Sequence, residues 1–299
     1  MARLVRSLTP TFSIVIAVYD DWVPLDQCLL SLAQQTNAPT FEVIVVDDGS
    51  DESAPEFIRT WSRAFPLTFI RQPHGGVAAA RNLGVQNCRG SLLLFVDADC
   101  KVQPDCLAVL AAKVADVPQH NCFQLHLTGD VSGLVGRAEE LRLITLQRHL
   151  LQPNGCIRYL NTAGFAIRRS RVNPTAGLFD PAALRGEDTL LLVSLMQAGE
   201  MPLFVAGATV QHAVSLSLSQ YLRKSVRSAY LEAGTYRIIE SKGVKIRVTN
   251  RERFKMLASM WKISRQPAIG RSAWFVLAVR QALPRVVSYI YRFTPSKSG

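Results

Sequence analysis

Residues 92–100 read LLLFVDADC, a run of apolar residues that ends in Asp97, Ala98 and Asp99. A short, continuous apolar run is typical of a strand that is buried on both faces of a sheet. Two carboxylates at the end of such a strand repel each other unless a cation or hydrogen-bond donors neutralise them. Mg²⁺ and Mn²⁺ prefer oxygen ligands and often share them with phosphates. The motif predicts a metal site for a diphosphate; the alternative is a solvated turn after the strand.

Three further strands are predicted upstream of this motif, over residues 12–19, 41–46 and 67–70, with a helix after each. The four strands start at residues 12, 41, 67 and 91, which are 24 to 29 residues apart, the spacing of βα units in a parallel sheet. Right-handed crossovers bring the carboxyl ends of such strands to one edge, where ligands bind. The second strand ends in Asp47 and Asp48, so acidic residues gather at this edge.

The rest of the chain is less regular. Helices are predicted over 104–114, 134–151 and 187–197, and strands over 164–167, 203–206 and 208–211. From residue 221 the pattern is helical and basic, and Pro267 and Pro284 are expected to break it into short pieces.

The positive charge is concentrated at the end of the chain. The 299 residues carry a formal net charge of +11, but residues 221–299 hold 17 basic and 3 acidic residues, whereas residues 1–220 hold 17 basic and 20 acidic ones. Such asymmetry favours an anionic partner: nucleic acid, a lipid surface or a phosphorylated ligand.

Composition and missing motifs exclude several classes. A hydrophobic content of 48% and a charged content of 19% indicate a globular protein. The six cysteines show no zinc-site spacing and are expected to be reduced thiols. No GxGxxG, Walker A or nucleophile-elbow motif occurs. No run of about 20 apolar residues and no leader pattern in residues 1–10 are found, so the cytoplasm is the expected location.

Several motifs in order resemble the family 2 glycosyltransferases, over roughly residues 10 to 215. They are FSIVIAVYD (12–20), VIVVDDGSD (43–51), GGVAAARNLG (75–84), LLLFVDADC (92–100), FAIRRS (165–170), GLFDP (177–181) and RGEDTLLL (185–192). The resemblance implies a GT-A fold, an α/β domain with a Rossmann-like, mostly parallel sheet flanked by helices. It also implies inverting transfer of a sugar from a UDP- or dTDP-type nucleotide diphosphate sugar, with Mn²⁺ or Mg²⁺.

The resemblance also implies roles for individual residues. Asp188 would be the catalytic base and Glu187 its neighbour, although acidic residues are also favoured in the first turn of a helix for structural reasons. Asp97, Asp99 and His212 would hold the metal, and for His212 a packed histidine is the alternative. Asn161 and Thr162 would lie in the acceptor region. Seven residues would bind the nucleotide sugar: Tyr19, Asp20, Asp47, Asp48, Arg81, Asp97 and Ala98.

We therefore expect a GT-A domain over residues 1–220 and a basic helical extension over 221–299. Basic residues interleaved with aromatic ones predict that the extension attaches peripherally to the anionic, cytoplasmic face of a membrane. The acceptor would be a saccharide or a lipid-linked sugar in cell-surface polysaccharide or glycoconjugate synthesis.

Three alternatives remain at this point. The first is a non-catalytic nucleotide-sugar-binding protein on the same fold. The second is a sugar-1-phosphate nucleotidyltransferase, which the sequence YDDWVP (19–24) after the first strand disfavours because it lacks a Gly-rich, basic signature. The third is a nucleic-acid-binding protein, which is disfavoured because no regularly spaced aromatic platform or recognition motif occurs.

Overall fold

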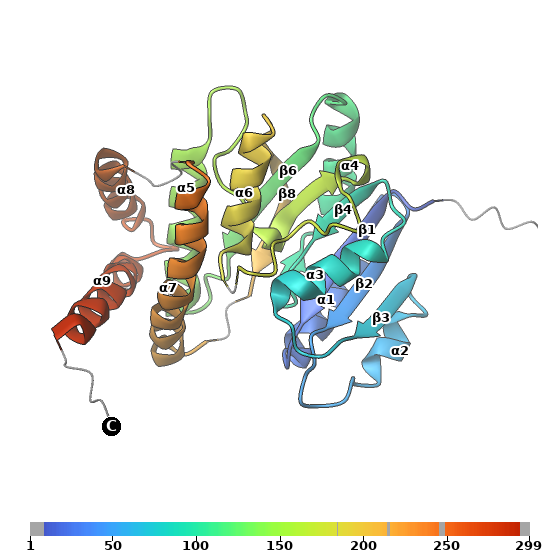
Figure 1. Cartoon of the computed structure of the whole chain (residues 1–299), viewed down its shortest axis with the longest axis horizontal. Helices are drawn as coiled ribbons and strands as arrows, with labels where there is room; N and C mark the ends of the chain where they lie inside the picture. The colour runs from blue at the N-terminus through green and yellow to red at the C-terminus, as the bar shows by residue number, and fades with distance from the viewer. Residues whose placement is uncertain (1–8, 184, 214–215, 245–248, 294–299) are drawn as a thin grey trace, which may run out of the picture.

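The computed structural model describes residues 9–183, 185–213, 216–244 and 249–293. Most of the segment on which the expected absence of a leader rests, residues 1–8, lies outside these ranges. The described strands form one sheet in the order β3-β2-β1-β4-β7-β6-β8-β5 (Figure 1). Their bounds are β1 Phe12–Val18, β2 Phe41–Asp47, β3 Leu67–Arg71, β4 Leu92–Phe95, β5 Cys100–Val102, β6 Cys122–Gly129, β7 Phe165–Arg168 and β8 Leu203–His212.

The α-helices lie on both faces of the sheet and beyond it. Their bounds are α1 Trp22–Ala33, α2 Phe57–Trp61, α3 Val77–Gln86, α4 Cys106–Asp116, α5 Leu134–Leu150, α6 Glu187–Gln197, α7 Leu218–Ser241, α8 Asn250–Ile263 and α9 Arg271–Phe293.

The first half of the sheet is parallel, as the sequence predicted. Strand β1 lies between β2 and β4 and is parallel to both, and β2 is parallel to β3. The register pairs Val18 with Asp47, so β1 and β2 end side by side. The residues that follow β1, β2 and β4 therefore meet at one edge of the sheet.

The second half of the sheet is mixed. Strand β7 is antiparallel to both β4 and β6, and β6 is parallel to β8. Strands β5 and β6 were not predicted, and the two short strands expected over 203–211 form the single strand β8. The short β5 runs antiparallel to β8, and this register places Cys100 opposite His212.

Alternation along the strands builds a core on each face of the sheet. In β1, Ile14 and Ile16 pack in the cluster that includes Leu29 of α1 and Leu107 of α4. Val15 points to the other face, into the cluster with α3 and α6. A strand with both faces covered must be apolar at every position, which explains the continuous run in FSIVIAV.

The C-terminal helices pack on the body of the protein. A separate apolar cluster joins Leu141 of α5 to Tyr221 of α7, Met260 of α8 and Leu277 of α9. Figure 1 shows these four helices gathered together, away from β1, β2 and β3. The division predicted at residue 220 falls in the first turn of α7.

One expectation for this region is wrong. Helix α8 ends before Pro267, but α9 continues through Pro284. A proline removes one backbone hydrogen bond and can kink a helix without ending it. Among the described residues, no helix is both long and apolar enough to cross a membrane.

Candidate functional site

A cavity of about 1080 Å³ opens at the edge of the sheet where β1, β2 and β4 end. One wall comes from the strand ends and the start of α3, and it includes Tyr19, Asp48, Arg81 and Asp97. The ion pair of Arg81 with Glu187 ties the first turn of α6 to this wall, and the opposite wall comes from α5, α9 and above all α7. The predicted edge site is therefore enclosed by a helix from the basic C-terminal part of the chain.

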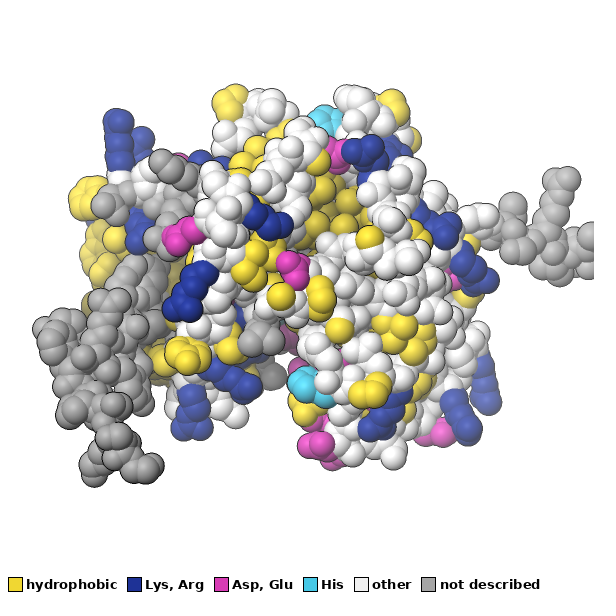
Figure 2. Space-filling view, in the orientation of Figure 1, with side chains coloured by type: hydrophobic (Ala, Val, Ile, Leu, Met, Phe, Trp, Pro, Cys, Tyr) yellow, Lys and Arg dark blue, Asp and Glu magenta, His cyan; other side chains and the backbone are white. Residues whose placement is uncertain are grey.

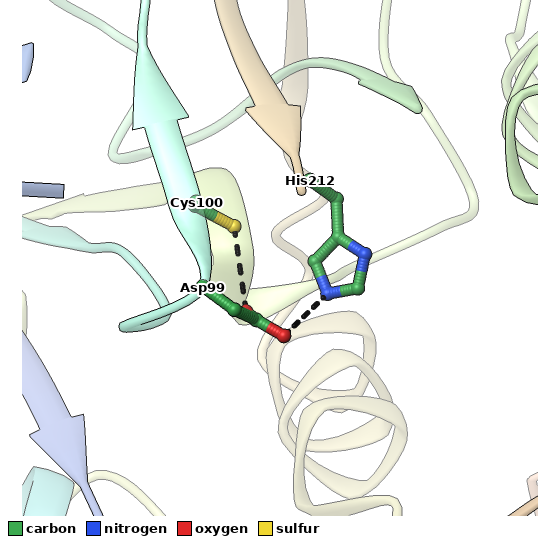
Figure 3. Close-up of side chains that lie close together, drawn as sticks. All are labelled: Asp99, Cys100 and His212. Atoms are coloured by element: carbon green, nitrogen blue, oxygen red, sulfur yellow. Dashed lines mark hydrogen bonds and ion pairs between the residues drawn. The ribbon is translucent and has the colours of Figure 1, made fainter. Parts of the chain in front are cut away.

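Asp99 and His212 meet at one end of this cavity (Figure 3). Oδ2 of Asp99 lies 3.2 Å from Nε2 of His212, and Oδ1 lies 3.9 Å from Sγ of Cys100. The possible ligand atoms of these three residues all lie within 4.8 Å of one another. The pairing of β5 with β8 brings them together, because it holds the end of β8 beside the DxD motif.

The ionisation of these groups favours a hard divalent cation. Burial raises the pKa of the Cys100 thiol well above its usual range, so it stays protonated and is a poor ligand. Burial alone would raise the pKa of Asp99, but the hydrogen bond and charge of His212 and the charge of Lys224 hold it below its usual range. Burial would lower the pKa of His212, but the hydrogen bond to Asp99 raises it. A carboxylate oxygen and an imidazole nitrogen therefore remain as donors.

Asp97 is bound differently from Asp99. The buried Arg81 donates from NH2 to Oδ1 of Asp97 at 2.7 Å and from NH1 to Oε1 of Glu187 at 2.6 Å. Asp97 is not in the Asp99, Cys100 and His212 group. The sequence placed Asp97 and Asp99 on one ion, whereas the structure directs an oxygen of Asp97 to Arg81.

Asp188 lines the cavity beside this bridge. Its neighbour Glu187 is neutralised by Arg81, but among the described residues no cation forms an ion pair with Asp188. Oδ1 of Asp188 accepts a hydrogen bond from the backbone N–H of Thr189 at 2.6 Å. Burial, and then the charge of Glu187, raise the pKa of Asp188 to about 7. A carboxylate with this pKa can take up a proton near neutral pH.

Asp48 organises the Gly75-Gly76 turn before α3. Its Oδ1 accepts from the backbone N–H of Gly75 and its Oδ2 from that of Gly76, both at 2.9 Å. Nδ1 of His74 lies 2.9 Å from Oδ2. The ring of His74 lies 4.6 Å from that of Tyr19, centroid to centroid, so both rings flank the mouth of the cavity.

Asp20 and Asp47 do not line the cavity. Oδ1 of the fully buried Asp47 accepts from the backbone N–H of Ser50 at 2.9 Å and from its hydroxyl at 2.6 Å. Oδ1 of Asp20 accepts from the backbone N–H of Asp51 at 2.9 Å. Both residues hold the 47–51 turn. Gly49 has a φ of +80° there, and a Cβ on it would meet the backbone nitrogen of His74 at 2.7 Å.

The remaining residues predicted for the site also line the cavity: Ala98, Asn161 and Thr162. Oδ1 of Asn161 accepts from the backbone N–H of Ala163 at 2.9 Å, and its Nδ2 donates to the hydroxyl of Tyr159 at 3.1 Å. Asn161 therefore positions Tyr159, whose ring faces the same space. The ligands of all these residues remain predictions.

The sequence did not point to the helix wall. Three residues of α7 at helical spacing, Lys224, Arg227 and Ser228, line the cavity, together with Arg142 of α5 and Arg280 of α9. Residues three and four apart share one face of a helix, so the α7 set could have been recognised as one face. No local pattern in the sequence, however, shows which face of α7 lines the cavity.

Together, the sheet, the edge cavity and the strand-end carboxylates are those of the GT-A fold. Residues 13–173 match the model of glycosyl transferase family 2, which covers more than half of the chain. The chain belongs to this family.

Curated relatives match part of the chain. The chain is 35% identical over 97 residues to glycosyltransferase AglE of Haloferax volcanii, which is 31% of this chain and 32% of the relative. It is 36% identical over 116 residues to validoxylamine A glucosyltransferase of Streptomyces hygroscopicus, which is 38% of this chain and 26% of the relative. The chain thus spans about a quarter to a third of the length of these relatives.

Solved structures confirm the fold. TarS 1–349 of S. aureus in complex with UDP has a TM-score of 0.57 at 18% identity, covering 94% of this chain and 91% of that one. The mannosyltransferase PcManGT of Pyrobaculum calidifontis, in complex with GDP-Man and Mn²⁺, has a TM-score of 0.58 at 15% identity, covering 97% and 82%. The coverage includes the C-terminal helices.

Proposed function

We propose that this protein is an inverting, divalent-cation-dependent glycosyltransferase that uses a UDP- or dTDP-type nucleotide diphosphate sugar. The observation that carries the proposal is the presence of Asp188, with its raised pKa, in the same cavity as the Asp99–His212 pair. The family match and the neighbours crystallised with UDP, GDP-Man and Mn²⁺ support it. They also favour it over the nucleotidyltransferase alternative.

Asp99 and His212 would hold the cation, because they supply an oxygen and a nitrogen donor 3.2 Å apart. An Mn²⁺ or Mg²⁺ ion held there would supply positive charge to the departing diphosphate. Lys224 adds positive charge near Asp99 from the opposite wall. The Arg81 bridge would hold Asp97 and Glu187, and with Glu187 the adjacent Asp188, in fixed positions around the donor.

Asp188 acts on the acceptor. It accepts the proton of the acceptor hydroxyl while that oxygen forms a bond to the anomeric carbon and the bond from this carbon to the diphosphate breaks. A single displacement inverts the anomeric configuration. A general base of this kind contributes about 10²–10⁴-fold to the rate.

The test is a panel of nucleotide sugars, with and without Mn²⁺, measured by thermal stabilisation and by release of nucleotide diphosphate. We expect stabilisation by one donor, and we expect Asp188→Asn to bind that donor while transfer falls about 10²–10⁴-fold. Asp105→Asn, an exposed carboxylate outside the cavity, is the matched control. Stabilisation by none of the nucleotides would overturn the proposal, and undiminished transfer by Asp188→Asn would overturn the role of the base.

We further propose that α8 and α9 attach the protein to an anionic membrane surface on its cytoplasmic side, where a lipid-linked or saccharide acceptor is presented. Five apolar side chains of these helices are exposed: Phe254, Leu257, Trp261, Phe275 and Val279. The rings of Trp261 and Trp274 lie 5.0 Å apart and join the two helices, and the Arg271 guanidinium lies 3.7 Å from the Trp261 ring centroid.

Figure 2 shows apolar and basic side chains side by side over α8. Aromatic residues with neighbouring basic residues are typical of helices that lie in a lipid interface. Each basic residue near an anionic surface contributes about 1 kcal/mol. The surface that α8 and α9 form, with basic and aromatic side chains together, should therefore bind anionic lipid more strongly than neutral lipid.

The membrane proposal is tested by co-sedimentation with vesicles of neutral or anionic phospholipid. We expect binding to anionic vesicles only, and loss of most binding in the double variant Phe254→Ser, Phe275→Ser. Tyr230→Ser, which removes an exposed aromatic of α7 outside this surface, is the control and should bind normally. Absence of sedimentation by the native protein would overturn the proposal.

A further inference from the structure

The two walls of the cavity carry opposite charge. The strand-end wall and the first turn of α6 hold six carboxylates and one guanidinium: Asp21, Asp48, Asp97, Asp99, Glu187, Asp188 and Arg81. The facing wall, built from α5, α7, α9 and the segments before α6, holds six cations and two carboxylates: Arg142, Arg158, Arg185, Lys224, Arg227, Arg280, Glu139 and Glu232. A metal ion offsets charge on the first wall only.

The carboxylates of the helix wall do not satisfy its cations. The buried Glu139 accepts from Nε of Arg142 at 2.6 Å and from the hydroxyl of Tyr221 at 2.5 Å. Arg280 lies with its guanidinium 5.5 Å from the Tyr221 ring centroid. Its Nε is buried and makes no hydrogen bond to the described residues. A buried, unpartnered donor on a charged group is costly unless a ligand completes it.

Glu232, the second carboxylate of the helix wall, also leaves the wall with an excess of positive charge. Burial raises the pKa of Glu232, even though Arg185, Arg280 and Arg142 act to lower it. The charges of three guanidinium groups thus act on one carboxyl group that burial still disfavours as a charge. Arg158 of this wall pairs outside the cavity, with Glu252 at 2.6 Å.

This excess of positive charge lies on the side of the cavity where the acceptor would bind. The half-buried Tyr159 lines the cavity together with Arg142 and Asp188, and the charges of both act on its hydroxyl. The donor diphosphate would already be met by the cation that Asp99 and His212 would hold and by the nearby Lys224. An anion bound at Arg142 and Arg280 would therefore belong to the molecule whose hydroxyl reaches Asp188.

From these contacts we infer that the acceptor carries a phosphate or carboxylate group, and that Arg280 and Arg142 bind it beside the catalytic base. The inference rests on the proposed function, since it names the class of acceptor for that reaction. Guanidinium groups suit this role because their planar donors match both phosphate and carboxylate oxygens.

The first experiment uses the native protein saturated with Mg²⁺ and the donor nucleotide. We expect inorganic phosphate to raise the melting temperature further, with sodium chloride at equal ionic strength as the salt control. Arg280→Met should abolish this increment, Arg280→Lys should retain part of it, and Arg265→Met, an exposed residue outside the cavity, should retain all of it. No increment in the native protein would overturn the inference even where the nucleotide binds normally.

The second experiment identifies the source of the anion. Sugar transfer is compared between methyl glucoside, methyl glucuronide, glucose 6-phosphate and a lipid-linked sugar phosphate. We expect kcat/KM for the charged acceptors to exceed that for the neutral one by about tenfold, and Arg280→Met to remove the difference. Equal use of neutral and charged acceptors would overturn the inference and leave the glycosyltransferase intact. Failure of the donor to bind would instead refute the proposed function.

Discussion

Arg81 and Glu187 are 106 residues apart in the sequence, yet NH1 of Arg81 lies 2.6 Å from Oε1 of Glu187. The same guanidinium binds Asp97 at 2.7 Å. One buried arginine on α3 thus ties the end of β4 to the start of α6. It neutralises Glu187 and leaves the adjacent Asp188 without an ion-pair partner among the described residues.

Replacing Arg81 by methionine should unfold the protein more easily, because two carboxylates would lose their partner. Removal of one member of a buried ion pair costs about 3–5 kcal/mol, and we expect a loss of this order in the free energy of unfolding measured in urea. Arg59→Met removes an exposed pair with Glu56 and should cost less than about 1 kcal/mol. Equal losses in the two variants would contradict the bridging role.

Asp188→Asn should stabilise the protein without metal or nucleotide, and increasingly so as the pH rises. The pKa of Asp188 is raised from 3.8 to about 7 in the native state, so the native state binds a proton that the unfolded state has released. The free energy of unfolding of the unsubstituted protein therefore falls as the pH rises from about 4 to about 7. This loss is absent in the asparagine variant. Melting temperatures at pH 4 and pH 8 measure the effect, and a pH-independent difference would refute it.

His212→Gln should weaken Mn²⁺ binding. We expect a loss of about 10–100-fold in affinity, measured by calorimetry. Because the pKa of His212 is raised by Asp99, binding to the native protein should also release a proton and weaken as the pH falls. His126→Gln, a histidine of β6 outside the cavity, is the control and should bind Mn²⁺ like the native protein. Unchanged affinity in His212→Gln would rule out the histidine as a ligand.

The native protein should not react with a thiol reagent on the timescale of minutes. All six cysteines are buried free thiols, and burial raises the pKa of Cys88, Cys106 and Cys122 to about 12. After unfolding, six thiols should react. Fewer than six in the unfolded protein would show a disulfide and contradict the expected reduced state.

The sequence anticipated the parallel half of the fold because βα units are local. The continuous apolar runs FSIVIAV and LLLFV, together with the glycines before α3, are sufficient to place the strands and their ends. The pairing of β5 with β8 was not predicted, because the two strands are more than a hundred residues apart in the sequence and β5 has only three residues. This pairing, and no local pattern, sets His212 beside Asp99.

The assignment of Asp47 and Asp48 shows a different limit. The sequence places both at the end of β2, but successive side chains of a strand point in opposite directions. Asp47 is the last residue of β2 and is buried, while Asp48 lines the cavity. A motif match cannot make this distinction, because it depends on where the strand stops.

The cavity has a consequence for how such enzymes diversify. The wall with the DxD motif comes largely from residues that match the family model, 13–173, whereas α7 and α9 lie entirely outside that match. Substitutions in α7 and α9 can therefore reshape one side of the cavity while the residues of the DxD motif stay the same. On the proposed function, we expect exchange of this helical segment between relatives to change the acceptor rather than the donor.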